Sequence, residues 1–92
     1  MKSVVNSYDA ISDETRRQIL DMLYAGNLTA GAIAKRFRYL SRPAVSKHLA
    51  VLRRSGLVLI RKRGRARVYS LNASPLKEVS DWISIYRPRW RR

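Results

Sequence analysis

The sequence predicts one mainly α-helical domain with a small β-hairpin near its C-terminal end. Apolar residues recur at helical spacing between residues 4 and 52. The pattern then changes to two runs rich in β-branched and aromatic residues, LVLIRK and ARVYSL, joined through Gly64 as in a hairpin turn. The chain has 92 residues, which suits a single domain over residues 1–92 with one modest core.

Two helices are expected before residue 28. Val4, Tyr8 and Ile11 fall at positions i, i+4 and i+7, so they should share the apolar face of a short first helix. Ser12 is expected to cap the second helix, because the acidic side chains that follow it suit the positive end of a helix dipole. The core stripe of the second helix consists of Ile19, Leu20, Met22 and Leu23.

Two further helices are joined by a tight turn. Thr29 is expected to cap the first of them and Ser41 the second, and Gly56 fits the left-handed residue that ends a helix. The hairpin follows directly, and Ser74 with Pro75 then predicts the start of a last helix. The expected order is therefore α-α-α-α-β-β-α, a helix-turn-helix with a wing. The expected core positions of the third and last helices are Ala30, Ile33, Ala34, Phe37, Leu76, Val79, Ile83 and Tyr86.

Basic residues far outnumber acidic ones. The chain carries 20 Lys and Arg against 6 Asp and Glu, a formal net charge of +14. A charge of about 2–8 is ample for the solubility of a small domain, so the excess indicates a polyanionic partner: DNA, RNA or an anionic membrane surface. Residues 1–34 carry a net charge of −1 and residues 35–92 carry +15, so the contact surface is expected in the later part of the chain.

The composition argues against several other classes of protein. There is no Cys, so disulfides and thiolate metal sites are excluded, and the single His48 cannot hold a metal alone. No apolar stretch approaches the ~18 residues of a membrane span, and the N-terminal residues lack the apolar core of a signal peptide. No nucleophile–base constellation and no Gly-rich phosphate loop is present. We therefore expect a cytoplasmic chain that is not an enzyme, holds no metal or cofactor and does not enter a membrane.

The segment LSRPAVSKHLAVLRRSGLV, residues 40–58, is typical of a DNA-recognition helix. Val45, Leu49 and Leu52 fall at i, i+4 and i+7 and should face the core. The opposite side carries small or basic residues, namely Arg42, Pro43, Ser46, Lys47 and Ala50. A slim face with hydrogen-bond donors can enter the major groove, and the amide groups at the Ser41 cap can hold a phosphate. An ordinary solvated helix face would explain the charge but not the small side chains.

The expected hairpin tip is strongly basic. Its sequence RKRGRAR, residues 61–67, supplies Arg61, Lys62, Arg63, Arg65 and Arg67. These side chains can neutralise phosphates, and an Arg at the tip can enter the minor groove. The alternatives are a localisation-like basic run and a solvated strand edge whose charges prevent pairing with another chain.

The last helix carries more large apolar residues than one small core can cover, because they occupy more than one of its faces. We interpret them as a homodimer interface shared with the first helix. The residues assigned to this interface are Val4, Tyr8, Ile11, Trp82, Ile83 and Tyr86. The alternative is that Trp82 folds onto its own domain.

These motifs resemble those of the ArsR-type winged helix repressors. AISDETRRQILDML is similar to the opening signature of that family, LTAGAIAKRF to its third helix, residues 40–58 to its recognition helix and GRARVYSLN to its wing; together they span roughly residues 8–74. The resemblance implies a homodimer that represses transcription from a two-fold symmetric DNA operator until a signal releases it. It places Ser41, Arg42, Pro43, Ser46, Lys47 and His48 in or beside the major groove.

The sequence departs from the family at its metal sites. Metal-sensing members carry Cys in the third helix, where this chain has Ala30 to Ala34, and others use His and acids on the last helix, where it has only Glu78 and Asp81. We therefore expect no arsenic, zinc or cadmium sensing at those positions. The turn FRYLS lacks the family's usual Gly and is one residue longer than the commonest form, which bears on the tilt of the recognition helix.

The sequence thus predicts a dimeric, sequence-specific transcriptional repressor that binds an inverted repeat in double-stranded DNA, with its own operon as one candidate target. Two alternatives stay open. A sequence-nonspecific architectural or RNA-binding winged helix protein would also need the high charge. A module that pairs with a different protein through its aromatic last helix would also need the exposed apolar residues.

Overall fold

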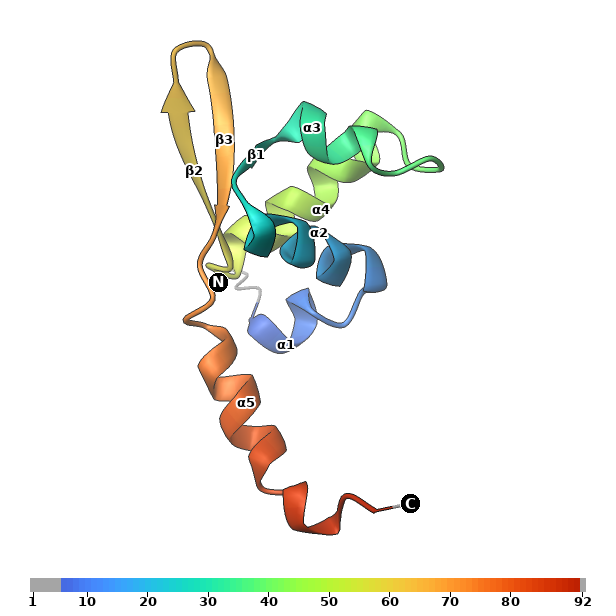
Figure 1. Ribbon diagram of the computed structural model, residues 1–92, viewed down its shortest axis with the longest axis vertical. Coiled ribbons are helices and arrows are strands. Elements are labelled where there is room, and N and C mark those ends of the chain that lie inside the picture. The colour runs from blue at the N-terminus through green and yellow to red at the C-terminus, as the bar shows by residue number, and fades with distance from the viewer. Residues whose placement is uncertain (1–5, 92) are drawn as a thin grey trace, which may run out of the picture.

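The computed structural model of the chain describes residues 6–91. In chain order its elements are α1 (Ser7–Ala10), α2 (Glu14–Ala25), β1 (Leu28–Thr29), α3 (Ala30–Lys35), α4 (Arg42–Arg54), β2 (Val58–Arg63), β3 (Ala66–Leu71), α5 (Leu76–Ser84) and the 3₁₀ helix η1 (Arg87–Arg89). This is the predicted order with two additions, β1 and η1. Helices α1 to α4 form a cluster beside the hairpin, and the hairpin and α5 project in opposite directions (Figure 1).

These two projections make the molecule long for its size. Its longest extent is 48 Å and its Cα radius of gyration is 14.7 Å, whereas about 12 Å is typical of a compact domain of this length. Much of the hairpin and of α5 therefore lies outside the core.

The start of α2 and the burial of α1 differ from the prediction. Asp13, not Ser12, caps α2: its Oδ2 accepts the N–H of Arg16 at 3.0 Å. The prediction was wrong because the Ser12 hydroxyl is used at the end of α1, where it donates to the carbonyl oxygen of Asp9 at 2.7 Å. Tyr8, expected on the apolar face, is 38% exposed, and the buried residues of α1 are its small ones. Val4 lies outside the described residues.

The helix pair α3 and α4 begins as predicted. The Thr29 hydroxyl oxygen accepts the N–H of Ala32 at 3.1 Å, and the Ser41 hydroxyl oxygen accepts the N–H of Ala44 at 3.2 Å. Each cap satisfies an amide that the first turn of a helix leaves free. Both predicted caps are therefore confirmed.

The C-terminal end of α4 turns the chain into the hairpin. The N–H of Gly56 donates to the carbonyl of Arg53 at 3.0 Å, and the N–H of Leu57 donates to the carbonyl of Leu52 at 3.1 Å. Gly56 has φ = 80°, as the left-handed residue of this helix ending requires. The prediction for Gly56 is confirmed, and β2 starts two residues later.

The sheet has three antiparallel strands in the order β1-β3-β2. Strands β2 and β3 pair from Val58↔Leu71 to Arg63↔Ala66, and Gly64 with φ = 59° begins the two-residue turn between them. Strand β1 adds to the free edge of β3, with Leu28 opposite Tyr69. β1 was not predicted, because two residues show no periodicity.

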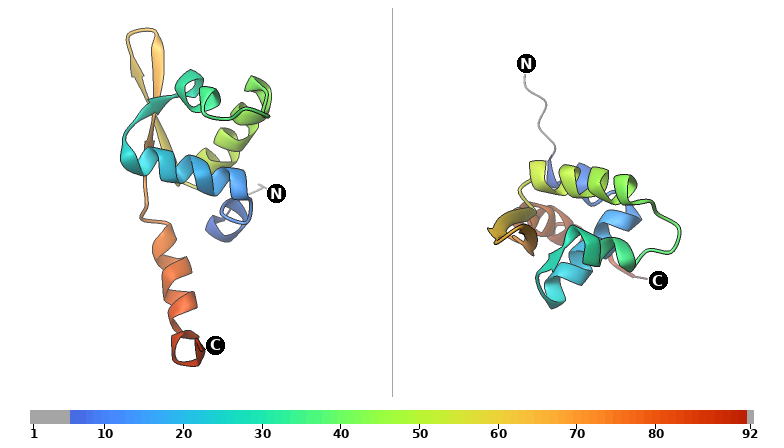
Figure 2. Two further views of the ribbon diagram at one scale, coloured as in Figure 1. Left: turned by 45° about the vertical axis from the view of Figure 1, so that its right-hand side comes forward. Right: turned by 90° about the horizontal axis from the view of Figure 1, so that it is seen from above.

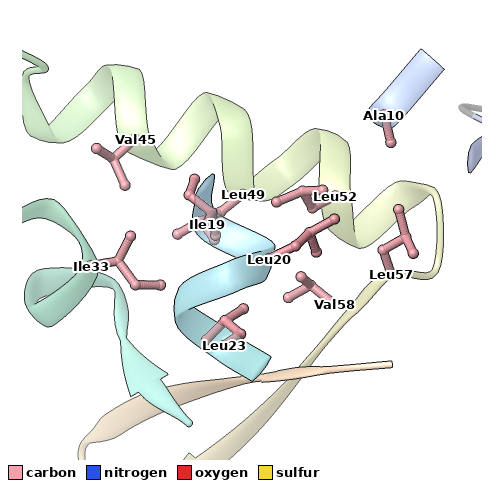
Figure 3. Close-up of a cluster of buried hydrophobic side chains, with 10 residues drawn as sticks. All are labelled: Ala10, Ile19, Leu20, Leu23, Ile33, Val45, Leu49, Leu52, Leu57 and Val58. Atoms are coloured by element: carbon pink, nitrogen blue, oxygen red, sulfur yellow. The ribbon is translucent and has the colours of Figure 1, made fainter. Parts of the chain in front are cut away.

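The core lies between α2, α3, α4 and the start of β2, with one residue from α1 (Figure 3). Its members are Ala10, Ile19, Leu20, Leu23, Ile33, Val45, Leu49, Leu52, Leu57 and Val58. These include three of the four residues predicted for α2 and all three predicted for α4; Met22 is partly buried against them. This core fixes one face of α4 and leaves the other free.

Helix α5 departs from its predicted cap and burial. The Ser74 hydroxyl donates to Oδ1 of Asn72 at 3.2 Å instead of capping the helix, which starts at Leu76. Val79 is its one buried residue, and Ile83 is 38% exposed. The helix runs away from the cluster beyond that point (Figure 2), so the rest of its apolar stripe has no core to cover it.

Candidate nucleic-acid interface

The free face of α4 carries the residues that the sequence placed there. Val45, Leu49 and Leu52 are 0%, 2% and 0% exposed. The opposite side is open to solvent and consists of Arg42, Pro43, Ser46, Lys47 and Ala50. The helix therefore presents a slim, cationic surface that can approach the edges of bases in a groove.

A concave surface joins α4 to the hairpin. One hollow of about 540 Å³ lies between the start of α3, α4 and the hairpin tip and is lined by Thr29, Ala30, Gly31, Arg42, Ser46, Arg65, Ala66, Arg67 and Tyr69. A second, of about 250 Å³, is lined by Ser46, Leu49, Ala50, Arg53, Arg54, Ile60, Arg67 and Tyr69. Ser46, Arg67 and Tyr69 line both, so the two hollows form one continuous basic surface, which we call the helix–wing groove.

Arg42 lies at the α3 side of this groove. A methyl group added at Gly31 would sit 3.8 Å from Nη1 of Arg42, which places the guanidinium over the start of α3. Arg42 can therefore reach along the groove from a position supported by the neighbouring helix.

The Lys and Arg side chains of α4 and the hairpin form no ion pairs with carboxylates of the described residues. Within residues 6–91, ion pairs shorter than 4.0 Å join only Asp13 to His48 and Lys77 to Asp81. None of the Lys and Arg side chains of α4 or the hairpin has a carboxylate partner there. Unpaired cations on a concave surface attract a polyanion without first breaking internal ion pairs.

The hairpin does not present its cations as one surface. Side chains alternate between the two faces of a strand, and Val58 of β2 is buried on the core side. Lys62 therefore shares the core side with its partner Arg67, whereas Arg61 and Arg63 lie on the opposite side. Arg65 occupies the turn between the strands. The sequence predicted a single basic tip, and the structure separates it into two faces.

His48 is turned toward the protein interior. Its Nδ1 lies 3.3 Å from Nη1 of Arg16 and 3.9 Å from Oδ2 of Asp13, and its side chain is 21% exposed. The hydrogen bond from the N–H of Arg16 holds the pKa of Asp13 below its ordinary value of 3.8, and the nearby charges of His48 and Arg16 act in the same direction, while burial opposes them. The contacts of His48 thus join α4 to the start of α2. They lie on a different side of α4 from its exposed face.

Sequence reasoning missed the position of Tyr69. This residue lines both hollows of the groove and packs against the core. Its alternation with Leu71, which also packs against the core, would have placed it on the inner face of the hairpin.

A second candidate surface lies at the other end of the molecule. Trp82 stacks edge-on with Tyr8, at 5.9 Å between ring centroids, and with Tyr86, at 5.4 Å. The Tyr8 hydroxyl donates to the carbonyl oxygen of Glu78 at 3.2 Å, which joins α1 to α5. Trp82 does contact its own domain, yet it remains 49% exposed. We call Tyr8, Trp82, Ile83 and Tyr86 the aromatic face; Ile11, assigned to the interface from the sequence, packs against the core instead.

Among the described residues, no group of three or more His, Asp or Glu side chains is arranged to hold a metal ion. No helix between residues 6 and 91 combines the length and apolar character needed to cross a membrane.

The chain is similar to known helix-turn-helix proteins and transcriptional regulators. A family model described as a helix-turn-helix domain matches residues 11–61. The transcriptional repressor SdpR of Bacillus subtilis is 41% identical over 85% of this chain and 86% of its own. The transcriptional activator HlyU of Vibrio cholerae is 43% identical over 80% of this chain and 68% of its own.

A solved structure agrees with the fold. An ArsR-like transcriptional regulator from Rhodococcus sp. RHA1 superposes with a TM-score of 0.79, at 34% identity, over 90% of this chain and 75% of its own. The family model covers α2, α3, α4 and part of β2, and therefore includes the whole exposed face of α4.

Proposed function

Because the chain belongs to the ArsR-type family of helix-turn-helix transcriptional regulators, we propose that it is a homodimeric repressor of an inverted repeat in double-stranded DNA. The observation that carries this proposal is the slim face of α4, which continues without a break into the basic helix–wing groove. A purely electrostatic coat would not need small side chains between its cations.

The contacts can be divided by chemistry. Arg42 and Lys47 are long donors at the N-terminal half of α4 and would read base edges, while Ser46 allows close approach. Ser41 and Pro43, at the start of the helix, would lie against a phosphate. The hairpin cations would contact the backbone, with Arg65 at the minor groove. These residues are Arg61, Lys62, Arg63, Arg65 and Arg67.

We further propose that the aromatic face forms the homodimer contact. Tyr8, Trp82, Ile83 and Tyr86 are each 38–50% exposed, and neighbouring exposed apolar side chains are typical of an interaction surface. A two-fold dimer would use the same face on both chains and would place two copies of α4 on successive turns of DNA.

The proposal includes no metal, cofactor or catalytic step. The chain lacks Cys, and its similarity is to proteins named as transcriptional regulators. Release from DNA would then depend on a signal other than the metals bound by the family's cysteine sites. A regulator of this kind must reach the chromosome, so the proposed location is the cytoplasm.

A reporter assay tests the regulatory direction. The promoter of the chain's own gene would be fused to a reporter, and the chain would be expressed in trans. A repressor lowers the output, and Arg42→Ala restores it because the DNA contact is lost. An increased output would instead make the chain an activator, the activity named for the Vibrio relative. An output that never changes would exclude its own promoter as the target.

The runner-up function is sequence-nonspecific binding of DNA or RNA. A net charge of +14 on 92 residues favours it, because such binding is almost wholly electrostatic. Nonspecific binding of this kind would show no preferred nucleic-acid sequence, and its affinity would fall steeply as the salt concentration rises.

A further inference from the structure

The outer face of the hairpin, which points away from α4, has a site of its own. A hollow of about 220 Å³ lies there, lined by Asn27, Arg61, Arg63, Val68 and Ser70. It shares no residue with the helix–wing groove. The strand register explains the grouping: Arg61 is opposite Val68 and Leu59 is opposite Ser70, so all of these side chains lie on one side of the sheet.

The donors of this hollow come from three separate segments. Arg61 and Arg63 stand two residues apart on β2, and Ser70 lies on β3. Asn27 directly precedes β1, the short strand that adds to β3. β1 therefore brings the Asn27 carboxamide to a hairpin face that would otherwise offer only its own side chains.

The chemistry of the hollow suits a phosphate group. Its polar lining consists of two guanidinium groups, a hydroxyl and a carboxamide, and it includes no acid. Neither Arg61 nor Arg63 belongs to an ion pair among the described residues. Two like charges held on one strand face repel each other, and an anion between them relieves that repulsion. Guanidinium groups bind phosphate oxygens through paired donors.

We propose that Asn27, Arg61, Arg63 and Ser70 form a phosphate-binding site distinct from the helix–wing groove. The proposal rests on the proposed function, because duplex DNA is the nearest source of phosphates. The minor groove is about 6 Å wide, so Arg65 at the tip would enter it, while the two faces of the hairpin behind the tip would each point toward one of the two flanking backbones. Lys62 and Arg67 would meet the strand nearer α4, and the outer site would hold phosphates of the strand on the far side.

Two charge-matched double variants test the assignment. Arg61→Gln/Arg63→Gln removes the outer cations, and Lys62→Gln/Arg67→Gln removes the same charge from the inner face. The Kd for an operator duplex and for a random duplex would be measured from 50 to 300 mM salt. Each lost phosphate contact lowers the slope of log K against log salt by about 0.9, so each double variant should lose about two units per bound chain.

Ethylation interference then separates the two faces. The outer variant should lose interference at phosphates on the far strand and keep it on the near strand, and the inner variant should do the reverse. Asn27→Ala and Ser70→Ala should weaken the same far-strand phosphates without changing the net charge. If both double variants lose the same phosphates, the hairpin has one contact surface and the proposed site is wrong.

A free phosphate group is the other source of the same chemistry. Inorganic phosphate would be titrated into the DNA-free protein against chloride at equal ionic strength, with amide NMR shifts of Asn27 and Ser70 as the readout. Saturable shifts that Arg61→Gln/Arg63→Gln abolishes, together with an unchanged DNA salt slope, would assign the site to a free phosphate. No shift and no change of slope would overturn the proposal. The operator-to-random ratio of wild-type Kd values tests the proposed function separately, since it can stand when the outer site fails.

Discussion

Nη1 of Arg16 lies 3.3 Å from Nδ1 of His48, and this contact ties the start of α2 to α4. The same guanidinium donates through Nε to the carbonyl of Ala10 at 2.7 Å and through Nη2 to the carbonyl of Asp9 at 3.1 Å. One side chain therefore joins α1, α2 and α4. Since α1 also contacts α5 through Tyr8, a chain of direct contacts joins the aromatic face to α4.

Arg16→Ala should destabilise the fold, because it leaves the carbonyl oxygens of Asp9 and Ala10 without their donor. We expect the free energy of unfolding to fall by about 1–3 kcal/mol. Urea denaturation followed by circular dichroism measures the change. Gln18→Ala, an exposed position on the same helix, is the control and should change stability little. If Arg16→Ala lowers the free energy of unfolding no more than Gln18→Ala does, the Arg16 contacts do not stabilise the fold.

Asp13 should make stability depend on acid pH. Its pKa is lowered in the folded chain, so its ionised form is favoured by folding, and its contribution is present above about pH 4 and is lost as pH falls through the folded pKa. Asp13→Asn keeps an acceptor for the helix cap but removes the charge. The free energy of unfolding of Asp13→Asn should therefore fall less than that of the wild type as pH is lowered below about 4. Parallel curves for the two proteins would contradict this role.

Arg42→Ala should cost ~1–3 kcal/mol of binding to the operator and relax the base preference at one position per half-site. Arg42→Lys keeps the charge but loses the paired donors that match guanine, so it should relax the preference while leaving the salt dependence intact. Competition titrations with single-base operator variants measure both effects. If operator and random DNA weaken equally, Arg42 contacts a phosphate instead.

Arg65→Ala should weaken binding to all sequences and reduce the slope of log K against log salt by about one unit per chain. The reason is its position in the hairpin turn, where it would contact phosphate charge rather than a specific base edge. Fluorescence anisotropy over a range of salt concentrations measures the slope. An unchanged slope would remove the hairpin turn from the interface.

Trp82→Ala should weaken self-association by roughly 30-fold or more, the loss expected of an aromatic residue at the centre of an interface. Sedimentation equilibrium measures the dimer dissociation constant directly. Tyr24→Ala provides an aromatic control, because Tyr24 is 84% exposed and lies on α2 away from the aromatic face. A wild-type chain that stays monomeric, or a Tyr24→Ala effect as large as that of Trp82→Ala, would contradict the proposed interface.

The helix-turn-helix could be predicted from sequence because its signals are local. Thr29, Ser41 and Gly56 each act through hydrogen bonds or backbone angles within a few residues. The spacing of Val45, Leu49 and Leu52 likewise defines a buried stripe without knowledge of its neighbours. The winged helix fold and the family are confirmed by the structure and the relatives.

The remaining features depend on distant contacts. Ser12 and Asp13 are both good caps, and only the use of the Ser12 hydroxyl by α1 decides between them. Strand β1 forms because β3 offers a free edge, and His48 turns inward because Arg16 approaches it. The two faces of the hairpin follow from a register that the basic run alone does not reveal.

The central claim is that this chain reads a DNA sequence as a dimer. Selection of bound sites from a random DNA pool at about 0.15 M salt, where nonspecific attraction is reduced, tests it most directly. We predict an enriched inverted repeat whose half-sites lie about one helical turn apart. Binding without any enriched motif, which disappears as salt is raised, would contradict the claim and support a nonspecific nucleic-acid-binding protein.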